Sequence, residues 1–159
     1  MRRFLFGFLL GAISIVAILV GIGHWLDVTD SLAKSDAIVA ISGDTGARAE
    51  TAITLWKQGY APLLIFSGGS SDPASVASAE LMKNRGLKSA ILVTSPYHQR
   101  RAAILFEREF DRTALSFRNH PADDPDWDAT LWWTSEPSRS LTLVELAKLG
   151  ALVVGQRPG

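Results

Sequence analysis

The chain has 159 residues, of which 47% are hydrophobic and 20% are charged, and its formal net charge is zero. This length suits one ordinary domain, and the neutral balance argues against a nucleic-acid-binding protein held by phosphate contacts. The chain contains no cysteine, which excludes disulfides, thiolate metal sites and cysteine nucleophiles together.

The first predicted element is a membrane anchor. Residues 4–23 form an uncharged apolar run, and a helix of this length spans a hydrocarbon core of about 30 Å. Arg2 and Arg3 precede the run, so the positive-inside rule keeps the N-terminus in the cytoplasm and the rest of the chain outside. We expect residues 1–25 to be a transmembrane anchor, with Trp25 at the interface. The alternatives are a cleaved signal peptide, whose apolar core is usually about 7–15 residues, and a buried core helix.

A polar linker over 26–35 leads to a domain predicted over 36–159. Short apolar runs that end in glycine or small polar residues are typical of buried parallel strands, and they alternate here with segments of helical periodicity. Such alternation implies right-handed crossovers. The predicted fold class is therefore α/β, a small Rossmann-like parallel sheet flanked by helices and preceded by one transmembrane helix. Strands are expected over 36–41, 63–66, 90–93 and 113–117, and helices over 44–58, 72–85, 95–110 and 137–154, with a loop over 119–133.

Apolar spacing also predicts which side of each helix faces the core. For the first helix of the domain, the buried side is predicted to carry Ala49, Ala52, Ile53 and Trp56. The third is predicted to bury Ala103, Phe106 and Phe110. The closing helix is predicted to bury a stripe of Leu143, Leu146, Ala147, Gly150 and Val154.

Small polar residues follow three of the predicted strands. The carboxyl ends of parallel strands form one rim where ligands bind. Glycines there let backbone N–H groups approach an anion at a helix N-terminus. The pattern is neither a dinucleotide fingerprint nor a P-loop, which needs a lysine, and a plain tight turn is the alternative. The rim segments are Gly43-Asp44, Ser67-Gly68-Gly69-Ser70 and Thr94-Ser95-Pro96-Tyr97-His98.

Four charged or titratable residues near this rim are candidates for chemistry. The guanidinium of Arg48 or Arg101 suits a phosphate or carboxylate, and His98 can exchange a proton near neutral pH. Glu80 can pair with a rim arginine or bind a sugar hydroxyl. The structural alternatives are a surface salt bridge for Arg48, a capping role for His98 with a basic helix face, and a solvent-facing Glu80.

An acidic loop is the one pattern that suggests a metal. Asp123, Asp124, Asp126 and Asp128 lie close together, as oxygens around calcium do. The glycine and distal glutamate of an EF-hand are missing, so a solvated acidic loop is the preferred interpretation. No metal site and no cofactor are predicted.

The motifs between Asp36 and Ala102, taken in order, resemble the YdcF/SanA/ElyC-like family, also called domain of unknown function 218. The resemblance covers about 36–110, and the last helix with Glu145 is similar to that of the family. It implies a Rossmann-like fold behind a membrane anchor and a role in envelope integrity, peptidoglycan assembly and vancomycin tolerance. The stretches that carry it are Asp36–Val39, Gly43, Arg48-Ala49, Gly59–Pro62, Ser67–Gly69, Ala79-Glu80, Val93–His98 and Arg101-Ala102.

The chain departs from the family at one place. Family members carry an extra strand and helix with a Glu…Ser-x-x-Thr-x-x-Asn motif, whereas here only Leu81–Leu92 joins the Ala-Glu helix to the third strand. This favours a pocket with fewer groups or a loss of activity.

Three functions follow as hypotheses. The first is an enzyme of the bacterial inner membrane, with its domain outside the cytoplasm, that acts on a phosphorylated cell-wall or lipid-linked intermediate. The second is a non-catalytic membrane-tethered binding or assembly module, and the third is a transferase that binds S-adenosylmethionine, as suggested for one branch of the family. The expected catalytic residues are His98 and Glu80, and the expected ligand-binding residues are Gly43, Asp44, Arg48, Ser67, Gly68, Gly69, Thr94, Ser95, Tyr97 and Arg101.

Overall fold

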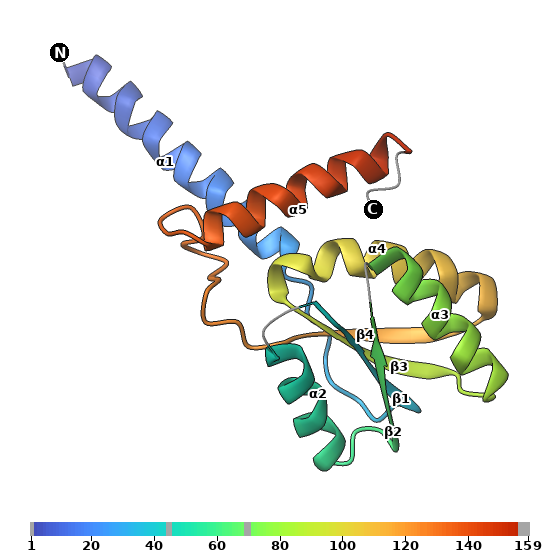
Figure 1. The fold of residues 1–159 in the computed structure, drawn as a ribbon. Coiled ribbons are helices and arrows are strands. Elements are labelled where there is room, and N and C mark those ends of the chain that lie inside the picture. The colour runs from blue at the N-terminus through green and yellow to red at the C-terminus, as the bar shows by residue number, and fades with distance from the viewer. Residues whose placement is uncertain (1, 44–45, 69–70, 156–159) are drawn as a thin grey trace.

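The computed structural model describes residues 2–43, 46–68 and 71–155. A four-stranded, all-parallel sheet is flanked by helices, and one long apolar helix projects from the domain (Figure 1). The predicted α/β class with an N-terminal apolar helix is confirmed. In chain order the elements are α1 (Arg2–Leu26), β1 (Ala37–Ile41), α2 (Ala47–Lys57), β2 (Leu63–Ser67), α3 (Ser71–Asn84), β3 (Ser89–Thr94), α4 (Pro96–Thr113), β4 (Ser116–Pro121) and α5 (Ser138–Val153).

The strand order β2-β1-β3-β4 brings the carboxyl ends of the first three strands to one edge. Ile41 of β1 lies opposite Ser67 of β2, and Ala40 of β1 lies opposite Val93 of β3. The backbone N–H of Ser42 extends this register, because it donates to the Ser67 carbonyl at 2.9 Å. The polar turns that follow β1, β2 and β3 therefore begin side by side.

Alternation along β1 divides the core between the two faces of the sheet. All five residues of β1 are buried. Val39 and its neighbours on the same face pack with α3 and α4, whereas Ile38 and Ala40 pack with α2. On the first face, Phe106 and Phe110 of α4 meet the ring of Phe117, and the buried face predicted for α4 is confirmed.

Several element boundaries differ from the prediction, and β4 shows the largest shift. The sequence predicts a strand over 113–117 and a loop from 119, whereas β4 covers Ser116–Pro121. The reason is that α4 continues to Thr113 and ends with Ala114 in the left-handed conformation, at φ 54°. Smaller differences occur elsewhere: α3 begins at Ser71 rather than 72, and α2 begins at Ala47 rather than 44.

The predicted inner faces of α2 and α5 are only partly right: Ala52 of α2 is buried and Leu146 of α5 is half-buried, but other members of each face are not. In α2, Trp56 is exposed, and the buried residues are Arg48, Ala52 and Leu55. In α5, Leu143 and Val154 of the predicted stripe are exposed. The buried residues of α5 are Ser138, Thr142, Glu145 and Leu149. In both helices the orientation is decided by polar partners inside the domain. Apolar spacing alone gives no information on such partners.

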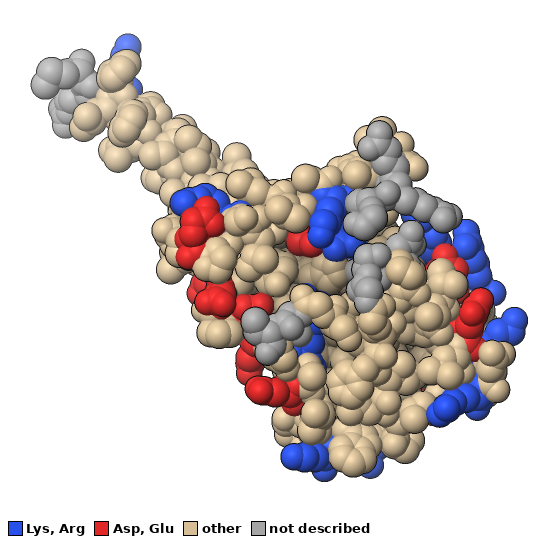
Figure 2. Space-filling model, in the orientation of Figure 1, with Lys and Arg blue, Asp and Glu red and all other residues tan. Residues whose placement is uncertain are grey.

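The end of α1 is packed into the domain. Leu26 is fully buried with Trp127, Trp132 and Leu149, and the Trp132 Nε1–H donates to the Leu19 carbonyl at 2.8 Å. Residues before Leu19 project with exposed side chains, and in Figure 2 this projection carries no acidic residue. The stretch Arg3–Leu26 is long and apolar enough to cross a membrane.

The segment between α1 and β1 is fastened along its length. The Asp30 carboxylate accepts from the backbone N–H and side-chain amide of Asn119 at 2.7 and 3.0 Å. Further on, the Asp36 carboxylate accepts from the backbone N–H groups of Lys88 and Ser89 at 2.7 and 2.9 Å. These donors hold the pKa of Asp36 below its ordinary value. The predicted linker is therefore part of the packed domain.

The closeness of α1 to the domain yields a matched pair of tests. A Cβ at Gly23 would overlap the backbone of Ala129, whereas a Cβ at Gly21 meets nothing. We expect Gly23→Ala to lower the free energy of unfolding by about 1–3 kcal/mol, as overpacking does, and Gly21→Ala to stay within about 0.5 kcal/mol. The measurement is denaturant unfolding of the full chain in detergent. Equal effects of the two changes would contradict the packing of α1 on this corner.

Candidate functional site

The site begins where β3 ends and α4 starts. Ser95 is the N-cap residue of α4 but makes no side-chain capping bond. Its Oγ instead accepts from the Arg48 Nε–H at 3.0 Å. Arg48 also donates from Nη1 to the carbonyls of Ile41 and Ser42 at 3.1 and 3.3 Å. Arg48 thus joins the carboxyl end of β1 to the N-terminus of α4, and at 5% exposure it is not the surface arginine of the structural alternative.

A buried ion cluster follows one turn into α4. The Glu145 carboxylate on α5 receives two hydrogen bonds from Arg101, from Nε at 2.8 Å and from Nη2 at 3.1 Å. This paired geometry is the strong, directional form of a guanidinium–carboxylate contact. The Nδ1 of His98 lies 3.0 Å from the same carboxylate. All three residues are buried, so the cluster ties α5 to α4.

The two titratable members of the cluster have pKa values displaced from their ordinary ranges. Burial by itself raises the pKa of Glu145, but the hydrogen bonds and charges of His98 and Arg101 outweigh it and lower the pKa to about 2. Burial lowers the pKa of His98, against the opposing effect of Glu145. At neutral pH the cluster therefore holds a carboxylate and a neutral imidazole.

The Nδ1 atom of His98 faces two neighbours that require opposite roles. It lies 3.0 Å from Glu145 Oε2 and 3.0 Å from Arg101 Nη2. A carboxylate only accepts and a guanidinium only donates, so a protonated Nδ1 serves Glu145 and an unprotonated Nδ1 serves Arg101. Both tautomers of the neutral ring have a partner, and Nε2 is correspondingly either an acceptor or a donor. A histidine whose two neutral tautomers are both accommodated is compatible with proton exchange.

The cluster borders the end of α1. Tyr97 packs against Trp127 at 6.1 Å between ring centroids. Arg100, on another side of α4, lies 5.2 Å over the ring of Trp25 and donates to the Trp25 carbonyl at 2.8 Å. The N-terminus of α4 is thus held against the last turn of the apolar helix.

The other predicted rim residues lie around the carboxyl ends of the strands. Gly43 lines a cavity of about 210 Å³ together with Arg48 and Phe66. Ser67 is buried and its Oγ donates to the Ala74 carbonyl at 3.4 Å, and Gly68 is exposed. Thr94 is fully buried, and its Oγ1 has no hydrogen-bond partner within the described ranges. The remaining two predicted residues, Asp44 and Gly69, lie outside the described residues.

Glu80 is not part of this cluster. It is exposed on α3 and lines a groove of about 420 Å³ with Arg108 and Arg112 of α4. The carboxylate that pairs with the rim arginine Arg101 is Glu145 instead. In the sequence, Glu145 is singled out only by the family resemblance. A further signal was present, because Glu145 is the one acidic residue between Ser138 and Val153.

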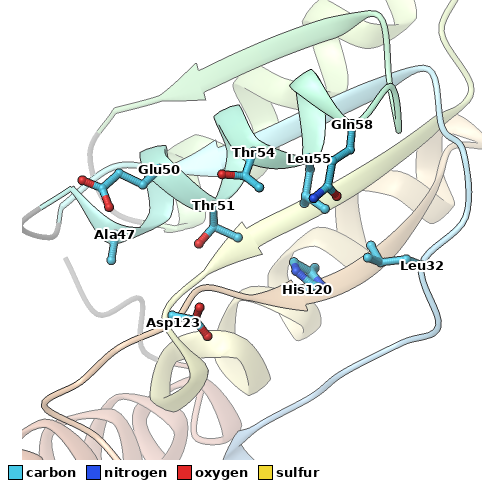
Figure 3. Close-up of a pocket in the computed structure, with 9 residues that line it drawn as sticks. All are labelled: Leu32, Ala47, Glu50, Thr51, Thr54, Leu55, Gln58, His120 and Asp123. Carbon is cyan, nitrogen blue, oxygen red and sulfur yellow. The ribbon is translucent and has the colours of Figure 1, made fainter.

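A second polar cavity lies on the α2 side of the sheet (Figure 3). It has a volume of about 400 Å³ and lies between Thr51 and Gln58 of α2 on one side and His120 and Asp123 on the other. His120 is half-buried with no hydrogen bond from its Nδ1 in the part of the chain that the structure describes. Burial lowers the pKa of His120, against the opposing charge of Asp123.

The acidic loop is built of turns. Asp128 accepts from the backbone N–H groups of Thr130 and Leu131, and Asp124 accepts from that of Asp126. Among the described residues no group of three or more acidic or histidine side chains is placed to hold a metal.

Sequence comparisons identify no relative of this chain: no family model and no curated protein matches it.

Glu145 generates a test of the cluster by pH. We expect Glu145→Gln to destabilise the protein by about 3–5 kcal/mol at neutral pH, because it leaves a buried arginine without its carboxylate. Since the folded pKa is about 2 and the ordinary value is 4.5, the native protein has this stabilisation above pH 4.5 and loses it as the pH falls toward 2. The Glu145→Gln variant should not show this fall in stability between pH 4.5 and pH 2. Unfolding midpoints measured from pH 7 to pH 2 give the comparison.

Glu136→Gln is the matched control. Glu136 pairs with Arg139 at 2.9 Å on the surface, where an ion pair contributes about 0–1 kcal/mol. An equal loss in the two variants would contradict the assignment of the buried cluster as the main electrostatic contact of α5.

Proposed function

We propose that the chain is a single-pass protein of the bacterial inner membrane whose domain lies outside the cytoplasm and binds a phosphorylated cell-wall or lipid-linked intermediate. Its role is in envelope or peptidoglycan maintenance. The resemblance to the YdcF/SanA/ElyC-like family is part of this proposal, and the parallel sheet behind an apolar helix is compatible with it.

The observation that carries the proposal is the convergence of two buried guanidinium groups on one helix N-terminus. Arg48 contacts the N-cap residue Ser95, and Arg101 lies one turn into the same helix. The positive end of a helix and buried cations together favour an anion. This convergence occurs at the carboxyl edge of the parallel sheet, where open α/β proteins bind ligands.

The place of the site relative to α1 supports a lipid-linked ligand. The same helix that carries His98 and Arg101 contacts Trp25 through Arg100. If α1 spans the bilayer, the phosphate of a lipid-linked molecule reaches this height from the membrane surface. In the enzymatic form of the proposal, His98 exchanges the proton, Glu145 positions it, and the Thr94 hydroxyl is a further hydrogen-bonding group.

A non-catalytic binding module is the second candidate, and the short connection between α3 and β3 favours it. Only residues 85–88 separate these two elements, so the additional segment of the family has no counterpart. The third candidate, a transferase using S-adenosylmethionine, fits less well because that cofactor is cytoplasmic.

Topology is the first test. Alkaline phosphatase fused after Gly159 should be active, and a fluorescent protein that folds only in the cytoplasm should stay dark there, because Arg2 and Arg3 hold the N-terminus inside. Deleting residues 4–18 provides the control, since the fusion should then remain in the cytoplasm. An inactive phosphatase fusion together with a fluorescent protein fusion that emits light would overturn the proposed location.

Ligand affinity is the second test. We expect Arg48→Lys and Arg101→Lys to weaken binding of a prenyl phosphate about 10- to 100-fold, since charged hydrogen bonds contribute about 1.5–3 kcal/mol and lysine lacks the guanidinium fork. Arg100→Lys is the control and should change affinity little, because Arg100 faces Trp25. Binding is measured by calorimetry on the full chain in nanodiscs, with thermal unfolding to confirm that each variant is folded. Folded Arg48 and Arg101 variants with native affinity would refute the anion site.

His98 separates the enzyme from the binding module. We expect His98→Gln to leave prenyl phosphate binding within about threefold but to abolish complementation of an envelope-stress phenotype, because glutamine does not exchange a proton near neutral pH. Full complementation by this variant would favour the non-catalytic module.

A further inference from the structure

The outer face of α5 is apolar and exposed. Leu143 is 55% and Val154 is 76% exposed, and Val144 beside Leu143 is also exposed. Ala147 and Gly150 complete the stripe between them. The residues that bind α5 to the domain, Thr142, Glu145 and Leu149, lie on its other side. An apolar stripe of this size on a terminal helix calls for an occupant.

The length of α1 indicates what that occupant is. This step rests on the proposed function, in which α1 spans a bilayer. The freely projecting apolar part runs from Phe4 to Ile18, and its length of about 22 Å is less than the hydrocarbon thickness of about 30 Å. From Leu19 onward α1 packs on the domain. A bilayer that covers residues 4–23 must therefore reach the part of the domain that contacts Leu19 and Gly23.

That part of the domain has the composition of a membrane interface. Trp132 donates to the Leu19 carbonyl, and Ala129 touches Gly23. Next to them, Leu131 is 52% exposed and Trp133 is half-buried. Tryptophan is enriched where the hydrocarbon core meets the headgroups. Leu146 and Leu149 of α5 pack in the same cluster as Leu19 and Ile22 of α1, so α5 starts from this level.

The direction and charge of α5 agree with a membrane surface. Figure 1 shows α5 crossing the domain end of α1, on the side of the sheet toward which α1 projects. The single acidic residue of α5, Glu145, is buried against Arg101, whereas Arg139 is exposed and Lys148 is partly so. A helix with an outward apolar face and basic flanks suits the interface of an anionic bilayer.

We infer that the outer face of α5 and the corner at residues 131–133 lie in the headgroup interface of the bilayer that α1 crosses. The domain is then seated on the membrane at two places, by α1 and by α5. Because Glu145 joins α5 to His98 and Arg101, the candidate site is held directly over the lipid headgroups.

The absence of cysteine makes this directly measurable. Single-cysteine variants of the full chain, Leu143→Cys and Val154→Cys, are spin-labelled in vesicles of phosphatidylcholine with phosphatidylglycerol. We expect both labels to be reached by oxygen more than by a water-soluble nickel complex. Two further variants set the scale: Ile13→Cys in the projecting part of α1, which should be deepest, and Lys57→Cys at the end of α2, which should be in water.

The four labels separate the possible failures. A water-exposed label at 13 would refute the membrane-spanning helix and with it the proposed location. A lipid-exposed label at 13 with water-exposed labels at 143 and 154 would refute the seating of α5 alone. Strong spin–spin broadening at 143 would assign the stripe to a second copy of the chain and would equally overturn this inference.

Discussion

The contact on which the arrangement of the domain depends is the Glu145 carboxylate between Arg101 and His98. Ion pairs of this kind are stabilising only when their hydrogen bonds are complete, and here both carboxylate oxygens accept from Arg101. Because these partners lie inside, the polar face of α5 is turned inward and its apolar stripe outward. Burial in the same cluster lowers the pKa of His98, against the opposing effect of this carboxylate. One buried pair thus determines the orientation of a helix, the chemistry of the site and the surface that the molecule presents.

Arg48 has a comparable influence on α2. Its guanidinium reaches the carbonyls that end β1 and the N-cap residue of α4, so the helix is rotated with Arg48, Ala52 and Leu55 inward. Trp56 then lies outside, where its Nε1–H donates to the Pro62 carbonyl at 3.3 Å. In both helices a buried charge overrides the apolar periodicity, because leaving a charge unsatisfied in the core costs more than exposing an apolar side chain.

The sequence was sufficient for the sheet and not for the two helix faces. Strands such as 37–41 are continuously apolar and end in turn residues, so their identity and order follow from local pattern. In α2, however, Ile53 and Trp56 lie next to Ala52 and Leu55, and spacing does not separate the two faces. Likewise, the contact of Glu145 with His98 joins residues 47 positions apart, which no local signal reveals. The topology predicts that the rim residues gather at one edge of the sheet. It does not predict which carboxylate contacts them.

The segment from Asp27 to Asp36 has a mechanical consequence. Hydrogen bonds to Asn119, Tyr60 and Ser89 hold it along the domain. The segment between α1 and β1 is therefore not a free linker that could extend. Without a free linker, the domain neither rotates nor moves away relative to α1. If α1 is fixed in a bilayer, the site remains at one height and samples the membrane in two dimensions only, through lateral diffusion. Molecules anchored in the same membrane then pass the site at a constant height, whereas a structure farther from the membrane than the domain extends is out of its reach.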